Sequence, residues 1–277
     1  MPGLHSDSND RIMITINGEK WTVVTPWHNE AQKDGFLRAW GYPKRGLLML
    51  QDKDGIGCGA MKNLCVDAAL AEGATGVIVL DDDCFPLPEG HLPVKDPLYD
   101  LIRRHVEALE PQEVEMVMEV TSPISRGTPY FNRTVRMPVA ASMGFWTGIG
   151  DYDAPAQLVR GATTPMEFVR KPVFGKYFAC CGMNLAFRPK EWLPWCRFID
   201  VPRMDDIWMG WLWEKEAYVR GFCFNLGGPL IRHSRQSNVW ANLRDESKYL
   251  EANETLWSDV ATHPSREYSV LRGLLPV

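Results

Sequence analysis

A chain of 277 residues with 45% hydrophobic and 23% charged residues has the length and composition of one large globular domain. Its 30 basic and 35 acidic residues give a formal net charge of −5, so the chain as a whole does not attract polyanions. A nucleic-acid partner would therefore need a local basic patch. The first ten residues contain no apolar stretch, no aliphatic run could span a bilayer, and the seven cysteines lack a CxxC pair. We expect a cytoplasmic protein without a signal peptide or a membrane segment.

Apolar strands alternate with helices through the first 80 residues. Such an alternation is typical of a parallel, doubly wound sheet with right-handed crossovers, and ligands of these sheets bind at the carboxyl ends of the strands. Pro26, Asp52 and Asp81 would then lie on one edge of the sheet. The predicted strands are residues 21–25, 47–51 and 77–80, and the predicted helices are a polar segment ending at Trp40 and residues 60–72.

The pattern after residue 90 is less regular, but further strands and helices are expected. We expect residues 1–10 to be disordered, residues 11–245 to form a single domain, and residues 246–277 to form a C-terminal helical extension. The predicted strands are residues 114–120, 178–187, 222–226 and 230–233, and the predicted helices include residues 105–109, 205–219 and 246–260.

Three aspartates, Asp81 to Asp83, directly follow the third predicted strand. In an extended segment alternate side chains share a face, so Asp81 and Asp83 should point together while Asp82 points away. Two converging carboxylates need a cation to offset their repulsion, and Mg²⁺ or Mn²⁺ prefers oxygen ligands and also binds diphosphate. A solvated acidic turn is the alternative interpretation.

Five sequence blocks resemble the reversibly glycosylated polypeptides, the plant UDP-arabinopyranose mutases. The blocks occur in the order found in that family and extend over more than half of the chain. The resemblance implies an A-type glycosyltransferase fold, an α/β architecture with a Rossmann-like, mostly parallel central sheet flanked by helices. It also implies a UDP-sugar donor and a divalent metal, Mn²⁺ or Mg²⁺. The blocks are LDDDCF (80–85), GFWTGIGDYDAPAQLV (144–159), CGMNLAF (181–187), RMDDIWMGW (203–211) and HSRQSN (233–238).

The resemblance also implies site residues. Asp81, Asp83 and His233 correspond to metal ligands, and Asp81 and Asp82 to residues that bind the donor. Arg232 could hold phosphate oxygens in bidentate fashion, or it could be solvated. Without the resemblance, a surface histidine would be the simpler interpretation of His233.

The remaining candidates have plain structural alternatives. Asp205 and Asp206 begin a predicted helix, where they could act as an acid/base pair or simply cap the helix. The amide of Asn184 could reach a sugar or satisfy backbone groups. In this fold the uracil and ribose are usually bound near the positions of Thr25, Asp52, Lys62 and Asn63.

The chain departs from the family at the arginine that is reversibly glycosylated. Thr134 stands opposite that arginine, with Arg133 and Arg136 beside it. The departure favours a glycosyltransferase that moves a sugar from a UDP-sugar to an acceptor hydroxyl, with hydroxymethylated pyrimidine in phage DNA as a candidate acceptor. The alternative is a UDP-arabinopyranose mutase with Arg136 or Arg133 as covalent carrier, and a third hypothesis is a silent binding subunit. The oligomeric state stays open.

Overall fold

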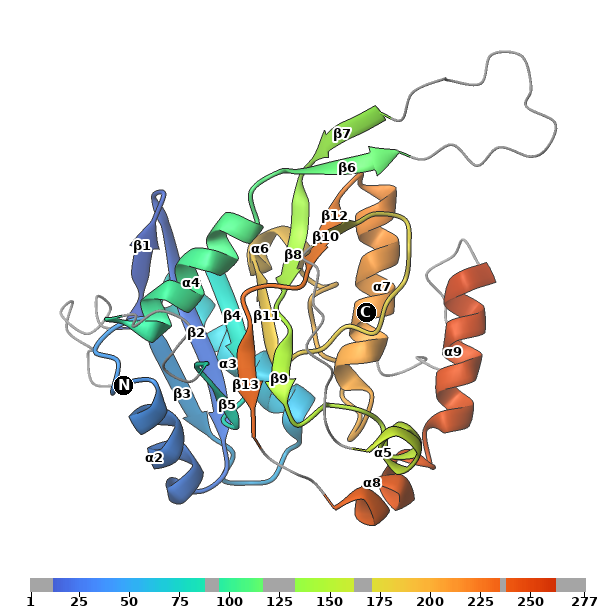
Figure 1. The fold of residues 1–277 in the computed structure, drawn as a ribbon, viewed down its shortest axis with the longest axis horizontal. Helices are drawn as coiled ribbons and strands as arrows, with labels where there is room; N and C mark the ends of the chain where they lie inside the picture. The colour runs from blue at the N-terminus through green and yellow to red at the C-terminus, as the bar shows by residue number, and fades with distance from the viewer. Residues whose placement is uncertain (1–11, 88–94, 117–132, 162–170, 235–237, 263–277) are drawn as a thin grey trace.

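The computed structural model of the protein describes residues 12–87, 95–116, 133–161, 171–234 and 238–262 (Figure 1). The predicted disorder of residues 1–10 lies outside these ranges. So do residues 117–120 of one predicted strand, residues 263–277 of the predicted extension, and Arg235 in the last sequence block.

An eight-stranded sheet forms the centre of the fold, in the order β1-β2-β4-β11-β8-β12-β10, with β3 also paired to β2. β2 is parallel to both β3 and β4, and β8 is parallel to β12, whereas β11 is antiparallel to its neighbours β4 and β8. The strands are β1 (Ile14–Ile16), β2 (Glu19–Trp27), β3 (Leu47–Gln51), β4 (Gly76–Leu80), β8 (Val139–Met143), β10 (Lys171–Val173), β11 (Asn184–Phe187) and β12 (Cys223–Leu226).

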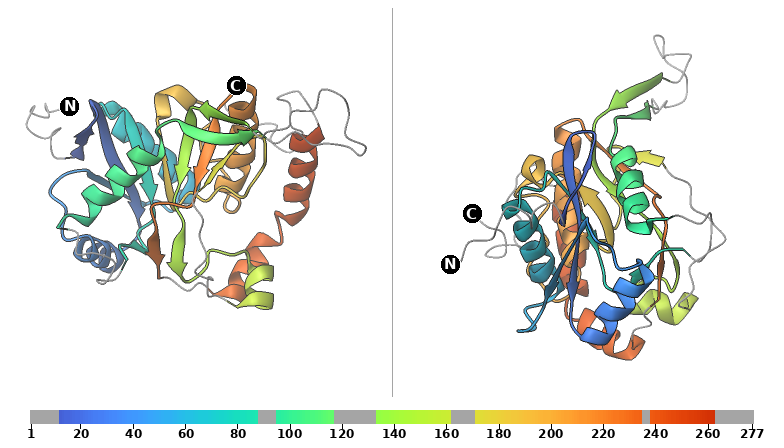
Figure 2. Two further views of the ribbon diagram at one scale, coloured as in Figure 1. Left: turned by 45° about the horizontal axis from the view of Figure 1, so that its top comes forward. Right: turned by 90° about the vertical axis from the view of Figure 1, so that its left-hand side faces the viewer.

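Helices cover both faces of this sheet. The right-hand view of Figure 2 shows α4 on one face and α3 and α7 on the other. This arrangement confirms the predicted α/β fold, a central sheet flanked by helices that is compatible with a Rossmann-like glycosyltransferase. The helices are α2 (Glu30–Ala39), α3 (Cys58–Ala71), α4 (Pro97–Ala108), α5 (Ala154–Arg160), α6 (Pro189–Trp192), α7 (Asp205–Val219), α8 (Val239–Glu246) and α9 (Leu250–Thr262).

Two small sheets extend the central one in opposite directions (Figure 1). β4 and β8 run the same way because both are antiparallel to β11. Their carboxyl ends lead to β5 (Cys84–Phe85) and β9 (Trp146–Gly148), which pair with β13 (Ile231–His233). The ribbon of β6 (Gln112–Met116) and β7 (Arg133–Met137) instead adjoins the amino end of β8.

Two predicted elements differ from the structure. Only residues 184–187 of the predicted strand 178–187 pair as β11; residues 178–183 are irregular, and Gly182 packs closely on Phe198 and Asp206 of the neighbouring layer. The predicted helix 246–260 begins later, as α9 at Leu250, because Glu246 is the last residue of the preceding helix α8. The buried carboxylate of Glu246 accepts a hydrogen bond from the Ala154 amide at 2.7 Å.

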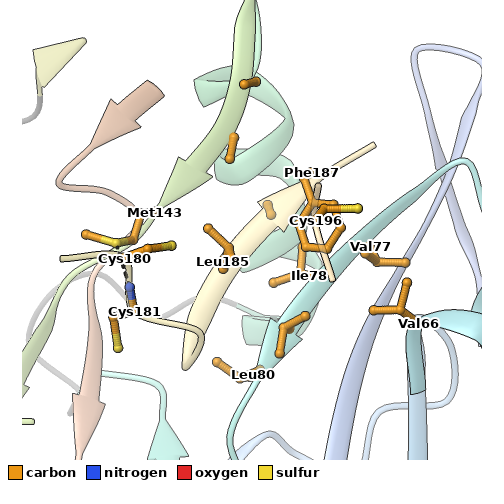
Figure 3. Packing of buried hydrophobic residues seen from close by; sticks show 14 of the residues in the cluster. Val66, Val77, Ile78, Leu80, Met143, Cys180, Cys181, Leu185, Phe187 and Cys196 are labelled. Carbon is orange, nitrogen blue, oxygen red and sulfur yellow. Dashed lines mark hydrogen bonds between the residues drawn. The ribbon is translucent and has the colours of Figure 1, made fainter. Parts of the chain in front are cut away.

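Aliphatic side chains of β4 and β11 form the middle of the core (Figure 3). All five residues of β4 are buried, as expected for a strand covered by helices on both faces. Six of the eleven tryptophans are buried as well, so most of them serve in packing. They are Trp21, Trp27, Trp40, Trp192, Trp208 and Trp213.

Replacing Gly76 with alanine is expected to destabilise the protein by about 2 kcal/mol or more. A Cβ atom on Gly76 would lie 2.4 Å from the ring of Trp21, which is fully buried and cannot move aside. Urea unfolding checks this prediction. Gly35→Ala is the control, since a Cβ there meets no atom within 4 Å. Equal urea unfolding midpoints for Gly76→Ala and Gly35→Ala would contradict this prediction.

Candidate functional site

The aspartate triplet follows β4 at the carboxyl edge of the sheet, as predicted. The amide of Asp81 donates to the carbonyl of Met183 at 3.3 Å. The carbonyl of Asp83 accepts from the amide of Ser234 at 3.2 Å, just beyond β13. Asp82 and Asp83 are 8% and 7% exposed. The backbone of the triplet is therefore fixed by β13 and by the segment before β11.

Asp83 faces His233 across β5 and β13. The Oδ2 of Asp83 lies 3.4 Å from the Nε2 of His233. The Nδ1 of the same ring lies 2.8 Å from the carbonyl of Ile149, so Nδ1 carries a proton and donates. Burial lowers the pKa of His233, but the hydrogen bond and charge of Asp83 outweigh burial and raise the pKa overall. When His233 is neutral, its unprotonated Nε2 and the carboxylate of Asp83 are both acceptors and face each other. The space between these two groups suits a cation.

Lys62 of α3 binds the first aspartate. Its Nζ lies 2.9 Å from Oδ1 and 3.2 Å from Oδ2 of Asp81, and its side chain is only 4% exposed. Burial lowers the pKa of Lys62, but Asp81 and neighbouring anionic groups hold it well above its usual value. For Asp81, burial raises the pKa, and the charge of Lys62 offsets this only in part.

Three further carboxylates come close to this pair. Asp206, at the start of α7, accepts hydrogen bonds from the amides of Gly182 at 2.8 Å and Ile207 at 2.9 Å. Burial, followed by the charge of Asp206, raises the pKa of Asp205 to about 7. The Oδ2 of Asp151 accepts a hydrogen bond from the Cys181 thiol at 3.4 Å, and the charge of Asp206 is among the causes that raise the pKa of Asp151.

The structure thus gathers five carboxylates around one lysine and one histidine. The carboxylates are those of Asp81, Asp83, Asp151, Asp205 and Asp206, and each of the three raised aspartate pKa values has another member among its causes. Sequence reasoning missed one residue at this edge, Cys58, an exposed thiol at the start of α3. Its position four residues before Lys62 on the same helix was the available signal.

Several predicted binding residues have structural partners. Asp52 accepts a hydrogen bond from the amide of Ile56 at 3.0 Å and so fixes the turn after β3. The side chain of Asn63 donates a hydrogen bond to the carbonyl of Phe198 and accepts one from the amide of the same residue. The Thr25 hydroxyl is buried and has no hydrogen-bond partner among the described residues.

The structure does not bring the other candidates into the carboxylate cluster. Arg232 is exposed on β13, with its guanidinium 5.3 Å from the centre of the Phe85 ring. Asn184 is fully buried and hydrogen-bonded within the core. Arg136 lies on β7, beyond the amino end of β8, whereas the carboxylates lie at the carboxyl end. The backbone of Arg133 is on the same strand.

The predicted metal ligands form a pair rather than a set of three. Asp83 and His233 face each other, while Lys62 takes both oxygens of Asp81. Within the described ranges, no group of three His, Cys, Asp or Glu side chains is arranged to hold a metal ion. A divalent ion shared with a diphosphate needs only one or two protein ligands, so the pair fits such an ion.

Comparison with known protein families shows to which family the chain belongs. Residues 75–260 match the family described as reversibly glycosylated polypeptide, a range that contains all five clustered carboxylates and His233. The chain belongs to the reversibly glycosylated polypeptide family. The resemblance of the five sequence blocks is thereby confirmed.

Curated members of the family carry a mutase name. A probable UDP-arabinopyranose mutase 1 of Pisum sativum is 32% identical over 189 residues, which are 62% of this chain and 50% of that protein. The UDP-arabinopyranose mutase 3 of Arabidopsis thaliana is 31% identical over 194 residues, 61% of this chain and 50% of that protein. This family member therefore spans about half the length of the curated relatives it matches.

The prediction of a glycosyltransferase that moves a sugar to an acceptor hydroxyl, with modified phage DNA as candidate acceptor, is wrong. The matching relatives are named as mutases, which agrees with the alternative hypothesis instead. The charge of the site also disfavours DNA, because a cluster of five carboxylates repels a phosphate backbone. No helix in the described part of this family member has both the length and the apolar composition that crossing a bilayer requires.

Proposed function

We propose that the protein interconverts the pyranose and furanose forms of a UDP-sugar, with UDP-arabinose as the first substrate to test. The carboxylate cluster at the carboxyl edge of the sheet carries this proposal, because it lies entirely within the range that matches a family with mutase members. In the isomerisation the bond from C1 to the ring oxygen O5 breaks and a bond from C1 to O4 forms. One proton moves from O4 to O5, and no acceptor is consumed.

Asp83 and His233 are the residues we assign to a divalent ion, Mn²⁺ or Mg²⁺. Such an ion would neutralise the diphosphate of the nucleotide sugar when bound. The hydrogen bond from Nδ1 to Ile149 keeps the lone pair of Nε2 directed toward Asp83. Lys62 supplies a second positive charge beside Asp81.

Asp205 is the residue we assign to proton transfer. Ring contraction needs a group that both accepts a proton from one sugar oxygen and gives a proton to the other. A carboxyl group with a pKa of about 7 can do both at neutral pH. Asp206, held by two backbone amides, would orient a hydroxyl as a fixed acceptor. Arg133 and Arg136 have no role in this proposal, because β7 leaves the opposite end of β8.

Incubation with UDP-arabinopyranose and Mn²⁺ is expected to yield the furanose form without any acceptor, and chromatography of the nucleotide sugars measures it. The same ratio should be reached from either form. Asp205→Asn should lower the rate by about 100-fold or more while UDP still binds. Asp200→Asn is the control, since Asp200 is exposed in the preceding loop. Release of UDP and free arabinose without furanose would contradict the proposal.

A further inference from the structure

A buried histidine outside the site connects the core to the strand that carries His233. His105 of α4 is fully buried, as are Ser142 of β8 and Asn184 of β11. The Nδ1 of His105 lies 3.0 Å from the Ser142 hydroxyl, and its Nε2 lies 2.8 Å from Oδ1 of Asn184. The proposed reaction makes no use of this histidine.

Both arms of this network end on one turn. The Nδ2 of Asn184 donates to the carbonyl of Pro229 at 2.9 Å, and the hydroxyl of Ser142 donates to the carbonyl of Gly228 at 3.2 Å. Because Nδ2 of Asn184 is a donor, its Oδ1 is the atom that faces the ring, so Nε2 of His105 carries a proton. Nδ1 of the neutral ring is then an acceptor, and the single hydroxyl proton of Ser142 serves either Nδ1 or the Gly228 carbonyl. Asn184 is therefore the side chain that joins the ring to the turn in either case.

The turn leads directly into β13. The amide of Ile231 donates to the carbonyl of Phe145 at 3.1 Å, and His233 follows two residues later. β13 has three residues and pairs with β5 and β9 on its two sides, and the turn before it sets where the strand begins. The fit is close: a Cβ on Gly144 would lie 2.0 Å from Nδ2 of Asn184 and 2.3 Å from the Pro229 carbonyl.

We infer that His105 is a positioning residue that sets the place of His233 through Asn184, Ser142 and the turn at Gly228 and Pro229. This inference rests on the proposed function in so far as His233 holds a metal. Partners that orient metal ligands affect metal affinity by about 10- to 100-fold. A purely structural role would lower stability without a selective effect on His233.

The test compares two variants at the same interface between α4 and the sheet. His105→Phe keeps a ring but loses both hydrogen bonds. Asn225→Ala removes another buried hydrogen bond to the same helix, from Nδ2 of Asn225 to the carbonyl of Ala108 at 2.8 Å. We expect His105→Phe to weaken Mn²⁺ binding by about tenfold or more, and Asn225→Ala to change it less than twofold. Isothermal titration with Mn²⁺ in the presence of UDP measures both.

Nitrogen chemical shifts of the His233 ring separate this inference from the metal assignment. Assigned with His233→Gln, they should show a proton fixed on Nδ1 in the wild type and exchange between tautomers in His105→Phe. If the wild type binds no Mn²⁺ but the shifts change, the metal assignment fails and the positioning role stands. Unchanged shifts and unchanged Mn²⁺ affinity in His105→Phe would overturn it. Should that variant not fold, Asn184→Ala removes the connection between the ring and Pro229, and wild-type shifts and Mn²⁺ affinity in that variant would overturn the inference.

Discussion

Replacing Lys62 with methionine is expected to lower the free energy of unfolding at neutral pH by about 3 kcal/mol or more. The Lys62 side chain is 4% exposed and its ammonium group touches both oxygens of Asp81. Methionine fills a similar volume, so the loss arises from the charge and not from a cavity. Without the lysine, Asp81 stays in a cluster of carboxylates that already raises its pKa, and such a charge is costly when unpaired. Urea unfolding measures the effect.

The double variant Lys62→Met, Asp81→Asn is expected to recover most of this loss. It removes both buried charges, and replacing a whole buried ion pair costs far less than breaking it. Lys33→Met is the matched control, because Lys33 pairs at 3.2 Å with Glu30, whose side chain is 66% exposed, while the Lys33 ammonium group lies 4.3 Å from the centre of the Trp27 ring. That exposed pair should contribute less than about 1 kcal/mol. Equal stability of Lys62→Met and the wild type would show that Asp81 is protonated or solvated instead.

Regular elements with a strong local pattern were predictable from the sequence. The apolar run at residues 47–51 and the helix at 205–219 have the predicted bounds in the structure. The run after Thr75 ends in three aspartates, and the carboxyl edge of the sheet holds them as expected. These features depend on hydrophobic spacing, which is a local property of the chain, and on the right-handed crossover that makes strands joined by a helix parallel.

The partners of side chains were not predictable in the same way. Asn184 had the expected strand position, but its amide binds His105 and Pro229 in the core because β11 lies between β4 and β8. Lys62 was expected near the nucleotide, and its contact with Asp81 depends on how α3 packs behind the sheet. Arg136 was placed beside the site by alignment alone, whereas the path of β7 takes it to the other end of β8. These contacts depend on strand order, which no local pattern encodes.

Replacing Glu214 with glutamine is expected to remove a pH dependence of stability. Glu214 of α7 is 6% exposed; its Oε2 accepts a hydrogen bond from the Phe178 amide at 3.1 Å, and its Oε1 has no partner among the described residues. Burial raises its pKa from 4.5 to about 9. Between these two values the folded protein holds a proton that the unfolded chain releases, so stability falls as the pH rises through this window.

The wild type should lose stability as the pH rises while Glu214→Gln should not, so the difference in stability between the two proteins should grow with pH. From pH 5 to pH 8 the wild type should lose about 4 kcal/mol relative to Glu214→Gln, whose amide keeps the shape but does not ionise. Urea unfolding of both proteins at several pH values measures the difference, and Glu254→Gln on the exposed side of α9 is the control. Parallel stability curves for Glu214→Gln and the wild type would mean that water reaches the carboxylate. A carboxyl group kept neutral within α7 would in turn explain how this helix packs on the core with an acidic residue facing inward.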